Sequence, residues 1–195
     1  MYPIFLKLDR VPCLVVGAGQ VAARKLGSLL AASALVTVVA PEAVPEIRRL
    51  AREGRIAWRE RPYRPGELEG FRLVIAASGS GEVNRQVFEE AARLGVPVNT
   101  VDDPEHCSFF VPAVVRRGPL TLAISTSGTA PYLSRRLREH LESRLYPGLE
   151  EDLAEVREAR ARINDTAADG AQKKVLVARE LEPLVEQILR RLEGR

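Results

Sequence analysis

Apolar residues fall into short runs that alternate with stretches of helical spacing over roughly the first half of the chain. Apolar positions that recur every three or four residues predict helices at 20–32, around 47–50 and at 83–94. Strands that alternate with helices imply right-handed crossovers and a parallel sheet covered on both faces. The nearly continuous apolar runs that predict its strands lie at residues 11–16, 35–40, 56–59, 72–77 and 96–101.

Beyond residue 104 the pattern changes to a β-hairpin followed by helices. Apolar runs at 109–115 and 120–124 flank a Gly-Pro turn, which predicts an antiparallel pair of strands. A loop of small residues at 125–131 then leads into a helix with a leucine at every fourth position. The remainder is charged and helical, with a linker at 164–170, and Pro183 is expected either to kink the last helix or to begin it.

The first strand ends in a glycine-rich turn, and helical spacing begins immediately after it. Gly17 permits a tight turn, and Gly19 lets the backbone approach a pyrophosphate with no side chain in the way. Ala22 is the third small residue of the pattern, where the helix must pack closely on the strand. The N–H groups at the start of the helix, around Gln20 and Val21, would face the anion with help from the helix dipole. This context favours a dinucleotide site over a purely structural turn.

Other predicted strands end at the same edge of the sheet, where ligands of such folds bind. Pro41 and Glu42 close the second strand, Ala77 and Ser78 close the fourth, and Asp102 follows the fifth. Small residues at the end of the fourth strand leave room for a ligand, and backbone N–H groups there could face it. Glu42 has two interpretations: it holds the hydroxyls of the adenosine ribose, or it lies in the first turn of the next helix, where the dipole favours it.

Composition narrows the choice of partners. The chain has 195 residues, of which 46% are hydrophobic and 28% charged, as is typical of globular proteins. Neither a membrane span nor a signal peptide is expected, and a net charge of +3 is too small to argue for nucleic acid. Because Cys13 and Cys107 are the only cysteines, we do not expect a disulfide scaffold. We expect a cytoplasmic location. No residues have the spacing of a structural metal site.

Positive charge gathers between residues 114 and 138, a stretch with five arginines and no acidic residue. Each arginine alone is typical of a solvated surface, but as a group they favour a partner that carries several negative charges. The loop at 125–131 also precedes a helix whose first N–H groups could hold a carboxylate. The arginines are Arg116, Arg117, Arg135, Arg136 and Arg138.

These patterns predict an α/β fold in three parts. Residues 1–113 form a dinucleotide-binding domain with a Rossmann-type parallel sheet, for which the resemblance described below implies NAD, residues 114–148 form a small dimerisation region of a β-hairpin plus a helix, and residues 149–195 form a C-terminal helical domain. A hairpin and one helix cannot bury a core alone. We therefore expect the middle region to pack against a second copy of the chain in a homodimer.

Four segments together resemble the precorrin-2 dehydrogenase family, which also forms the first part of the multifunctional sirohaem synthases. They are residues 17–25, 99–104, 108–112 and 125–131, in the family's order and spacing. The resemblance runs from residue 3 to about residue 145, and since no methyltransferase domain follows, it implies the stand-alone form. It implies that NAD takes a hydride from precorrin-2, an acidic tetrapyrrole, to give sirohydrochlorin. In some members the same site then inserts ferrous iron.

Asp102 matches the aspartate that the family uses, and its carboxylate would accept the proton released as hydride leaves. The alternative from the residues alone is that Asp102 only makes a turn or caps a helix, as we expect of Asp103. His106 has two interpretations. It assists acid–base catalysis or the delivery of a metal, or it is an ordinary loop residue without a functional role. Cys107 is expected to be a packed thiol rather than a metal ligand.

The substrate's carboxylates are expected on the second small-residue loop and on nearby arginines. Some relatives carry a phosphorylated serine in this loop where this chain has Thr126, which leaves phosphorylation here open. Ser127 and Thr129 could instead be ordinary helix caps. The residues expected to bind substrate are Thr126, Ser127, Gly128, Thr129, Arg116 and Arg135.

Two alternatives to the dehydrogenase alone stay open. The first adds insertion of ferrous iron at the same site, because Asp102 would serve both reactions. The second is a ligand-sensing Rossmann module in which NAD binding regulates an interaction without a reaction. The choice of NAD over NADP is also open, although Glu42 would repel a 2′-phosphate if it reaches the ribose.

Overall fold

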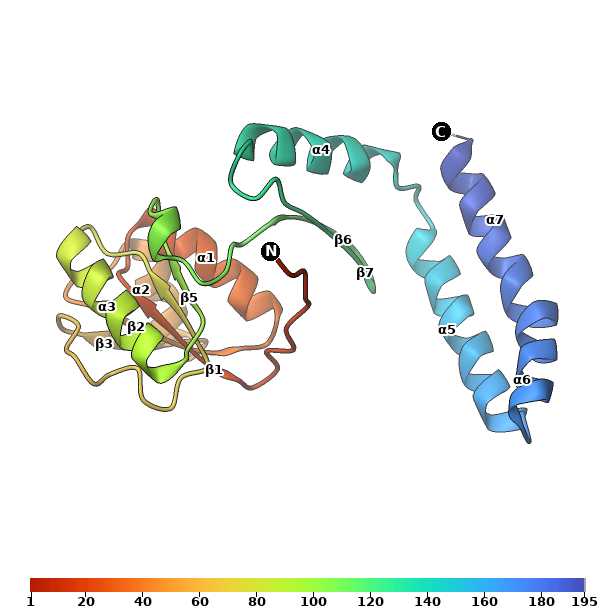
Figure 1. Ribbon diagram of the computed structural model, residues 1–195, viewed down its shortest axis with the longest axis horizontal. Helices are drawn as coiled ribbons and strands as arrows, with labels where there is room; N and C mark the ends of the chain where they lie inside the picture. The colour runs from red at the N-terminus through yellow and green to blue at the C-terminus, as the bar shows by residue number, and fades with distance from the viewer. Residues whose placement is uncertain (195) are drawn as a thin grey trace. The chain divides into compact units, whose positions relative to one another are not determined.

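The computed structural model describes residues 1–194, and its first compact unit, Met1–Val111, is built on a parallel sheet (Figure 1). The five strands run in the order β3-β2-β1-β4-β5, and every neighbouring pair is parallel. The strand order reverses between β1 and β4, as in doubly wound dinucleotide folds, which confirms the predicted fold class. The strands are β1 (Pro12–Val16), β2 (Leu35–Ala40), β3 (Ala57–Glu60), β4 (Leu73–Ala76) and β5 (Val98–Thr100).

Helices cover both faces of this sheet, which explains why its strands are apolar almost throughout. Val15 packs in one core cluster with α1 (Gln20–Ala31) and α2 (Pro45–Arg52). Its neighbour Leu14 points to the other face and packs in a second cluster with α3 (Gly81–Leu94). The central strands are therefore buried on both sides, and the loops at their ends have a rigid support.

The second unit begins at Pro112 and contains one hairpin and a set of helices. The hairpin pairs β6 with β7 in antiparallel register, as predicted. Among residues 1–194, none of the helices is long and apolar enough to cross a lipid bilayer. The elements are β6 (Ala113–Arg117), β7 (Leu120–Ile124), α4 (Pro131–Arg144), α5 (Leu149–Thr166), α6 (Gly170–Leu176), a π-helical turn (Val177–Leu181) and α7 (Glu182–Glu193).

The C-terminal helices differ from the sequence prediction in their boundaries. α5 continues through Thr166 and α6 begins at Gly170, so the predicted linker is shorter than expected. Asp169 caps α6, because its side chain accepts a hydrogen bond of 2.8 Å from the N–H of Gln172. Pro183 is the second residue of α7, directly after the π-helical turn, and α6, this turn and α7 follow one another with no residue between them, so the proline lies within a continuous helical run. The division into three domains stays a prediction.

Candidate functional site

A cavity of about 630 Å³ opens at the carboxyl edge of the sheet in the first unit. The loops that follow all five strands contribute to its walls, as a ligand site at the switch point of such a sheet requires. It brings together every residue that the sequence predicted for the cofactor and for the base. These residues are Gly17, Gly19, Gln20, Val21, Pro41, Glu42, Ala77, Ser78 and Asp102.

The glycine turn after β1 has the geometry that the sequence predicted. Gly17 has φ +104°, and a Cβ added there would lie 2.2 Å from the carbonyl oxygen of Ala77. Its N–H also donates to the carbonyl of Val39 at 2.9 Å, so the turn is packed between the ends of β2 and β4. Only glycine fits this position.

Gly19 is the residue that precedes α1, and it leaves the start of that helix open. Apart from its two neighbours in the chain, none of the described residues has an atom within 4 Å of the position that a Cβ on Gly19 would occupy. Gln20 and Val21, in the first turn of α1, line the cavity. The first N–H groups of a helix lack partners within the helix, and the dipole favours an anion beside them. This end of the cavity suits a phosphate.

Glu42 lies between β2 and α2 and lines the cavity. Because α2 begins only at Pro45, the interpretation that Glu42 belongs to the first turn of that helix is wrong. The side chain is exposed at the end of β2, which is where dinucleotide folds hold the adenosine ribose. Its role as a ribose ligand stays a prediction.

The loop after β4 is held by the buried side chain of Asn84. The Asn84 Oδ1 atom accepts hydrogen bonds from the Ser78 N–H at 3.0 Å and from the Ser78 hydroxyl at 2.9 Å. Its Nδ2 donates to the Ser78 carbonyl at 3.2 Å. The Ser78 N–H is therefore used inside the loop, whereas the sequence suggested that backbone N–H groups here would face the ligand. Ser78 shapes the wall of the cavity.

Asp102 lines the cavity from the turn that follows β5. It has φ +58°, a left-handed conformation that costs energy for any residue with a Cβ and that recurs at active sites. The neighbouring Val101 N–H still donates to the Ala76 carbonyl at 2.9 Å, so the turn starts from a fixed sheet position. Asp102 also acts electrostatically on Lys25 of α1: burial lowers the pKa of Lys25, and the charge of Asp102 opposes that fall.

Asp103 and His106 form a pair of their own. The His106 Nδ1 and the Asp103 Oδ2 atoms are 2.7 Å apart, and the His106 ring meets the Phe88 ring edge-on at 4.8 Å between centroids. Of the described residues, those that line the cavity include Asp102 but neither Asp103 nor His106. Of the two neighbouring aspartates, the structure therefore brings only Asp102 to the cavity.

Sequence reasoning missed Tyr63, which lines the cavity after β3. Its hydroxyl donates to Oε2 of Glu90 at 2.5 Å, and the N–H groups of Gly66 and Leu68 donate to the same carboxylate at 2.8 and 3.0 Å. Burial raises the pKa of Glu90, but these hydrogen bonds outweigh it and hold the pKa below its ordinary value. The position of Tyr63 after a strand that ends at this edge could have identified it.

The residues predicted to bind substrate lie in the second unit. Thr126 Oγ1 accepts a hydrogen bond of 3.1 Å from the N–H of Ala130, the residue that precedes α4. Ala130 holds the cap position, so the interpretation of Ser127 or Thr129 as the cap of this helix is wrong. Gly128 has φ +80°, which fits the predicted turn. Substrate binding by this loop stays a prediction.

Glu139, one residue beyond the basic stretch, pairs with three of the arginines. Its carboxylate accepts from Arg135 at 3.0 Å, from Arg136 at 2.8 Å and from Arg138 at 3.3 Å. Arg135 and Arg136 are exposed on α4 whereas Arg138 and Glu139 are half-buried, and the hydrogen bond from Arg135 leads the effects that lower the pKa of Glu139. Arg116 is exposed on β6. The basic character of this region is thus smaller than its arginines alone suggest.

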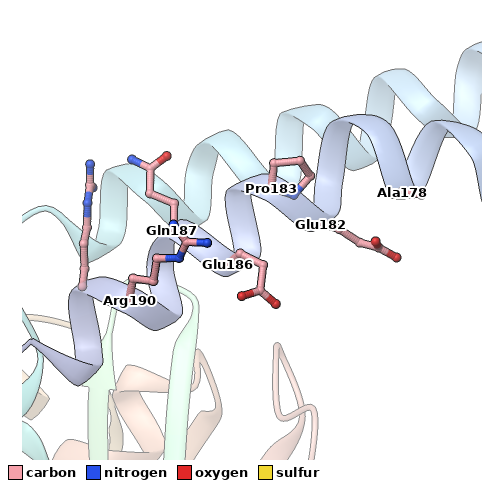
Figure 2. A pocket seen from close by; sticks show the side chains of 7 residues that line it. Ala178, Glu182, Pro183, Glu186, Gln187 and Arg190 are labelled. Atoms are coloured by element: carbon pink, nitrogen blue, oxygen red, sulfur yellow. The ribbon is translucent and has the colours of Figure 1, made fainter.

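A second hollow, of about 710 Å³, lies along the π-helical turn and α7 (Figure 2). Figure 2 shows side chains of both charge signs along one helix, among them Glu182, Glu186 and Arg190. Within residues 1–194, no group of three or more His, Cys, Asp or Glu side chains is arranged to hold a metal ion. None of the residues predicted for the cofactor, the base or the substrate lines this hollow.

Fold and cavity together define a dinucleotide-binding domain of the doubly wound type. A family model described as putative NAD(P)-binding matches residues 4–113, and one described as the central part of a sirohaem biosynthesis protein matches residues 117–144. The chain therefore belongs to this NAD(P)-binding family, and the similarities below confirm the family expected from its four motifs.

Two curated relatives and one solved structure illustrate the similarity. A siroheme synthase of Methylobacillus flagellatus is 45% identical over 176 residues, which is 89% of this chain and 37% of the relative. One of Methylococcus capsulatus is 49% identical over 141 residues, 72% of this chain and 30% of the relative. The chain thus spans about a third of their length. The structure of SirC, a precorrin-2 dehydrogenase, matches with a TM-score of 0.76 and 25% identity, covering 97% of this chain and all of that one.

Proposed function

We propose that the protein oxidises precorrin-2 to sirohydrochlorin with NAD as hydride acceptor. The observation that carries this proposal is the single cavity that joins the glycine turn after β1 to Asp102 after β5. The matching structure of a precorrin-2 dehydrogenase over nearly the whole chain supports it, as does the similarity to siroheme synthases.

The residues present fit NAD. The Gly17 turn and the open start of α1 suit the pyrophosphate, and Glu42 lies where the ribose hydroxyls are held. A carboxylate at that place would repel a 2′-phosphate and favour NAD over NADP. When bound, NAD supplies the hydride acceptor for the oxidation.

Asp102 then acts as the general base. Loss of a hydride and a proton from the substrate forms a new double bond, and the carboxylate takes the proton. Its strained turn directs it at the cavity, while Asp103 is paired with His106. The loop with Thr126 and the arginines Arg116 and Arg135 would hold the substrate's carboxylates.

We also propose that the active form is a homodimer. α4 exposes Tyr132, Leu133, Leu137 and Leu141, and a second copy of the chain would cover them. Such a pair would supply the packing partner that the hairpin and α4 require.

Anaerobic formation of NADH from precorrin-2 tests the reaction. We expect the wild type to form NADH, and Asp102→Asn to lower kcat by about a hundredfold or more because it removes the base. Asp103→Asn is the matched control and should keep most of the rate. NAD affinity, measured by calorimetry, should be unchanged in both variants. Absence of NADH from the wild type, with NAD still bound, would favour a sensing module, and a fully active Asp102→Asn would exclude this base.

The similarity to siroheme synthases favours a second candidate activity, insertion of ferrous iron into sirohydrochlorin. The test supplies sirohydrochlorin and ferrous iron without NAD and follows the absorbance of sirohaem. A rate above the enzyme-free reaction that Asp102→Asn abolishes would support it. An unchanged rate would remove this candidate.

A further inference from the structure

The segment after Asp102 folds back along the free edge of β5. The Val98 N–H donates to the Ser108 hydroxyl at 2.8 Å, and the Ser108 N–H donates to the Val98 carbonyl at 2.9 Å. Nearer the turn, the Thr100 hydroxyl donates to the His106 carbonyl at 2.6 Å. The chain therefore leaves β5, passes through Asp102 and returns beside the same strand.

The sulfur of Cys107 lies at the centre of this closed loop. It accepts hydrogen bonds from the Thr100 N–H at 3.2 Å and from Asn99 Nδ2 at 3.4 Å. It also lies 3.2 Å from the carbonyl oxygens of Thr100 and Asp103, to either of which the thiol can donate its one proton. Burial raises the pKa of the Cys107 thiol, so the sulfur keeps that proton at neutral pH.

These contacts hold the backbone on both sides of Asp102. Thr100 precedes it by two residues and donates its N–H to the sulfur, and Asp103 follows it with its carbonyl oxygen 3.2 Å from the sulfur, within reach of the thiol proton. Asp102 itself has φ +58°, a conformation that persists only where the surroundings over-determine it. Without the sulfur, the Thr100 N–H would lose its partner and the turn could relax toward a less strained conformation.

We infer that Cys107 is a positioning residue: its sulfur ties Thr100 to Asp103 and thereby keeps the Asp102 carboxylate on the cavity. The inference rests on the proposed function, because it matters for turnover only if Asp102 is the base. Cys107 touches neither substrate nor cofactor in this role. It acts through the backbone of the turn, and its pairing partners lie entirely within the first unit.

The test compares Cys107→Ala with Cys107→Ser in the full-length chain. Alanine removes both the acceptor and the donor, whereas serine keeps one of each. We expect Cys107→Ala to lower kcat about tenfold or more, since small misplacements of a catalytic group are costly, with the KM for NAD unchanged. Cys107→Ser should recover most of that loss. A merely structural role would lower the unfolding midpoint without this split between kcat and KM.

Cys13→Ala is the matched control. Cys13 is fully buried in β1, away from the turn, so its loss should lower stability and leave kcat unchanged. A kcat for Cys107→Ala within about twofold of the wild type, or no recovery in Cys107→Ser, would overturn the inference. Asp102→Asn, assayed alongside these variants, distinguishes a failure of the proposed function from a failure of the positioning role. If Asp102→Asn stays active, the proposed base is wrong; if it is inactive while Cys107→Ala is fully active, only the positioning role is wrong.

Discussion

The two units of the chain bury their apolar residues to very different extents. In the first, the central strand is inaccessible on both faces, with Leu14 and Val15 at 0% exposure. In the second, the helix α4 leaves Leu133 50% exposed and Leu137 39% exposed. Within its described part, residues 112–194, the buried apolar side chains are Val115, Tyr146, Leu149, Ala159 and Ile163.

This difference indicates which unit is stabilised by contacts within one chain and which depends on assembly with a partner. The first unit has a core on each face of its sheet and carries a formed cavity, so its site depends on contacts within one chain. The second unit has apolar side chains that its own elements do not cover, which is typical of a surface completed by a partner. Mutations in the first unit should therefore act on folding and cofactor binding, and those in the second on assembly and substrate.

The largest effect is expected at the glycine turn of the first unit. Gly17→Val forces a branched side chain into a left-handed position and onto the Ala77 carbonyl. We expect a loss of about 4 kcal/mol in the free energy of unfolding and no detectable NAD binding. Denaturant unfolding and calorimetry measure the two quantities.

Gly27→Ala is the control for this substitution. Gly27 lies inside α1, and apart from its chain neighbours and the nearby backbone of that helix none of the described residues has an atom within 4 Å of its added Cβ, so the variant should gain about 0.5–1 kcal/mol. Normal NAD binding by Gly17→Val would contradict the assignment of the turn.

A smaller effect is expected on α4 of the second unit. Leu137→Glu places a charge in the face that we propose to be covered in the dimer, and we expect about 3 kcal/mol less dimer stability. Light scattering after size-exclusion chromatography measures the mass. Leu189→Glu, at an exposed leucine of α7, should leave the mass unchanged. A Leu137→Glu variant that keeps the wild-type mass while folded would argue against the α4 interface.

The carboxylate of Glu90 gives a third prediction, in the first unit. Glu90→Gln leaves one of the three donors on this buried group without a good acceptor, and we expect a loss of about 2 kcal/mol at neutral pH. Because the folded pKa of Glu90 lies below its unfolded value, its contribution is full above about pH 4.3 and is lost as the pH falls through the folded pKa.

Urea unfolding across this acidic range measures the contribution of Glu90. The difference in unfolding free energy between the wild type and Glu90→Gln should shrink toward acid. Glu89→Gln, at the exposed neighbour, is the control that removes one carboxylate from α3 without touching these three hydrogen bonds. A difference that stays constant with pH would mean that the carboxylate's charge is not what stabilises the loop.

The elements of the sheet and the ends of its strands were predictable from the sequence, for a physical reason. Strands buried on both faces require continuous apolar runs, and β2 (Leu35–Ala40) lies at the predicted residues. Parallel strands bring their carboxyl ends together, so Gly17 and Asp102 were expected on one edge despite their separation in sequence.

The contacts that shape the site were not predictable in the same way. Tyr63 and Glu90 are 27 residues apart, and their hydrogen bond depends on how the loop after β3 packs against α3. The hydrogen bonds of Cys107 form because the chain returns along β5, and the spacing of apolar residues in the sequence does not reveal that return. Glu139 lies one residue beyond the basic stretch at 114–138, which contains no acidic residue, so its three ion pairs with arginines of that stretch were not predicted.

Glu139 provides the smallest stability effect and the sharpest contrast with Glu90. Its partners Arg135 and Arg136 are exposed and only Arg138 is half-buried, and ion pairs at the surface contribute little to folding, so Glu139→Gln should leave the unfolding midpoint nearly unchanged. The freed guanidinium of Arg135 should attract the acidic tetrapyrrole more strongly and lower its KM about twofold at low salt, with kcat unchanged. Steady-state kinetics at low and high salt measure this, because screening should remove the effect. Glu142→Gln, which removes one of the two carboxylates paired with Arg138, should change KM less, and an unchanged KM in Glu139→Gln at low salt would show that these arginines do not face the substrate.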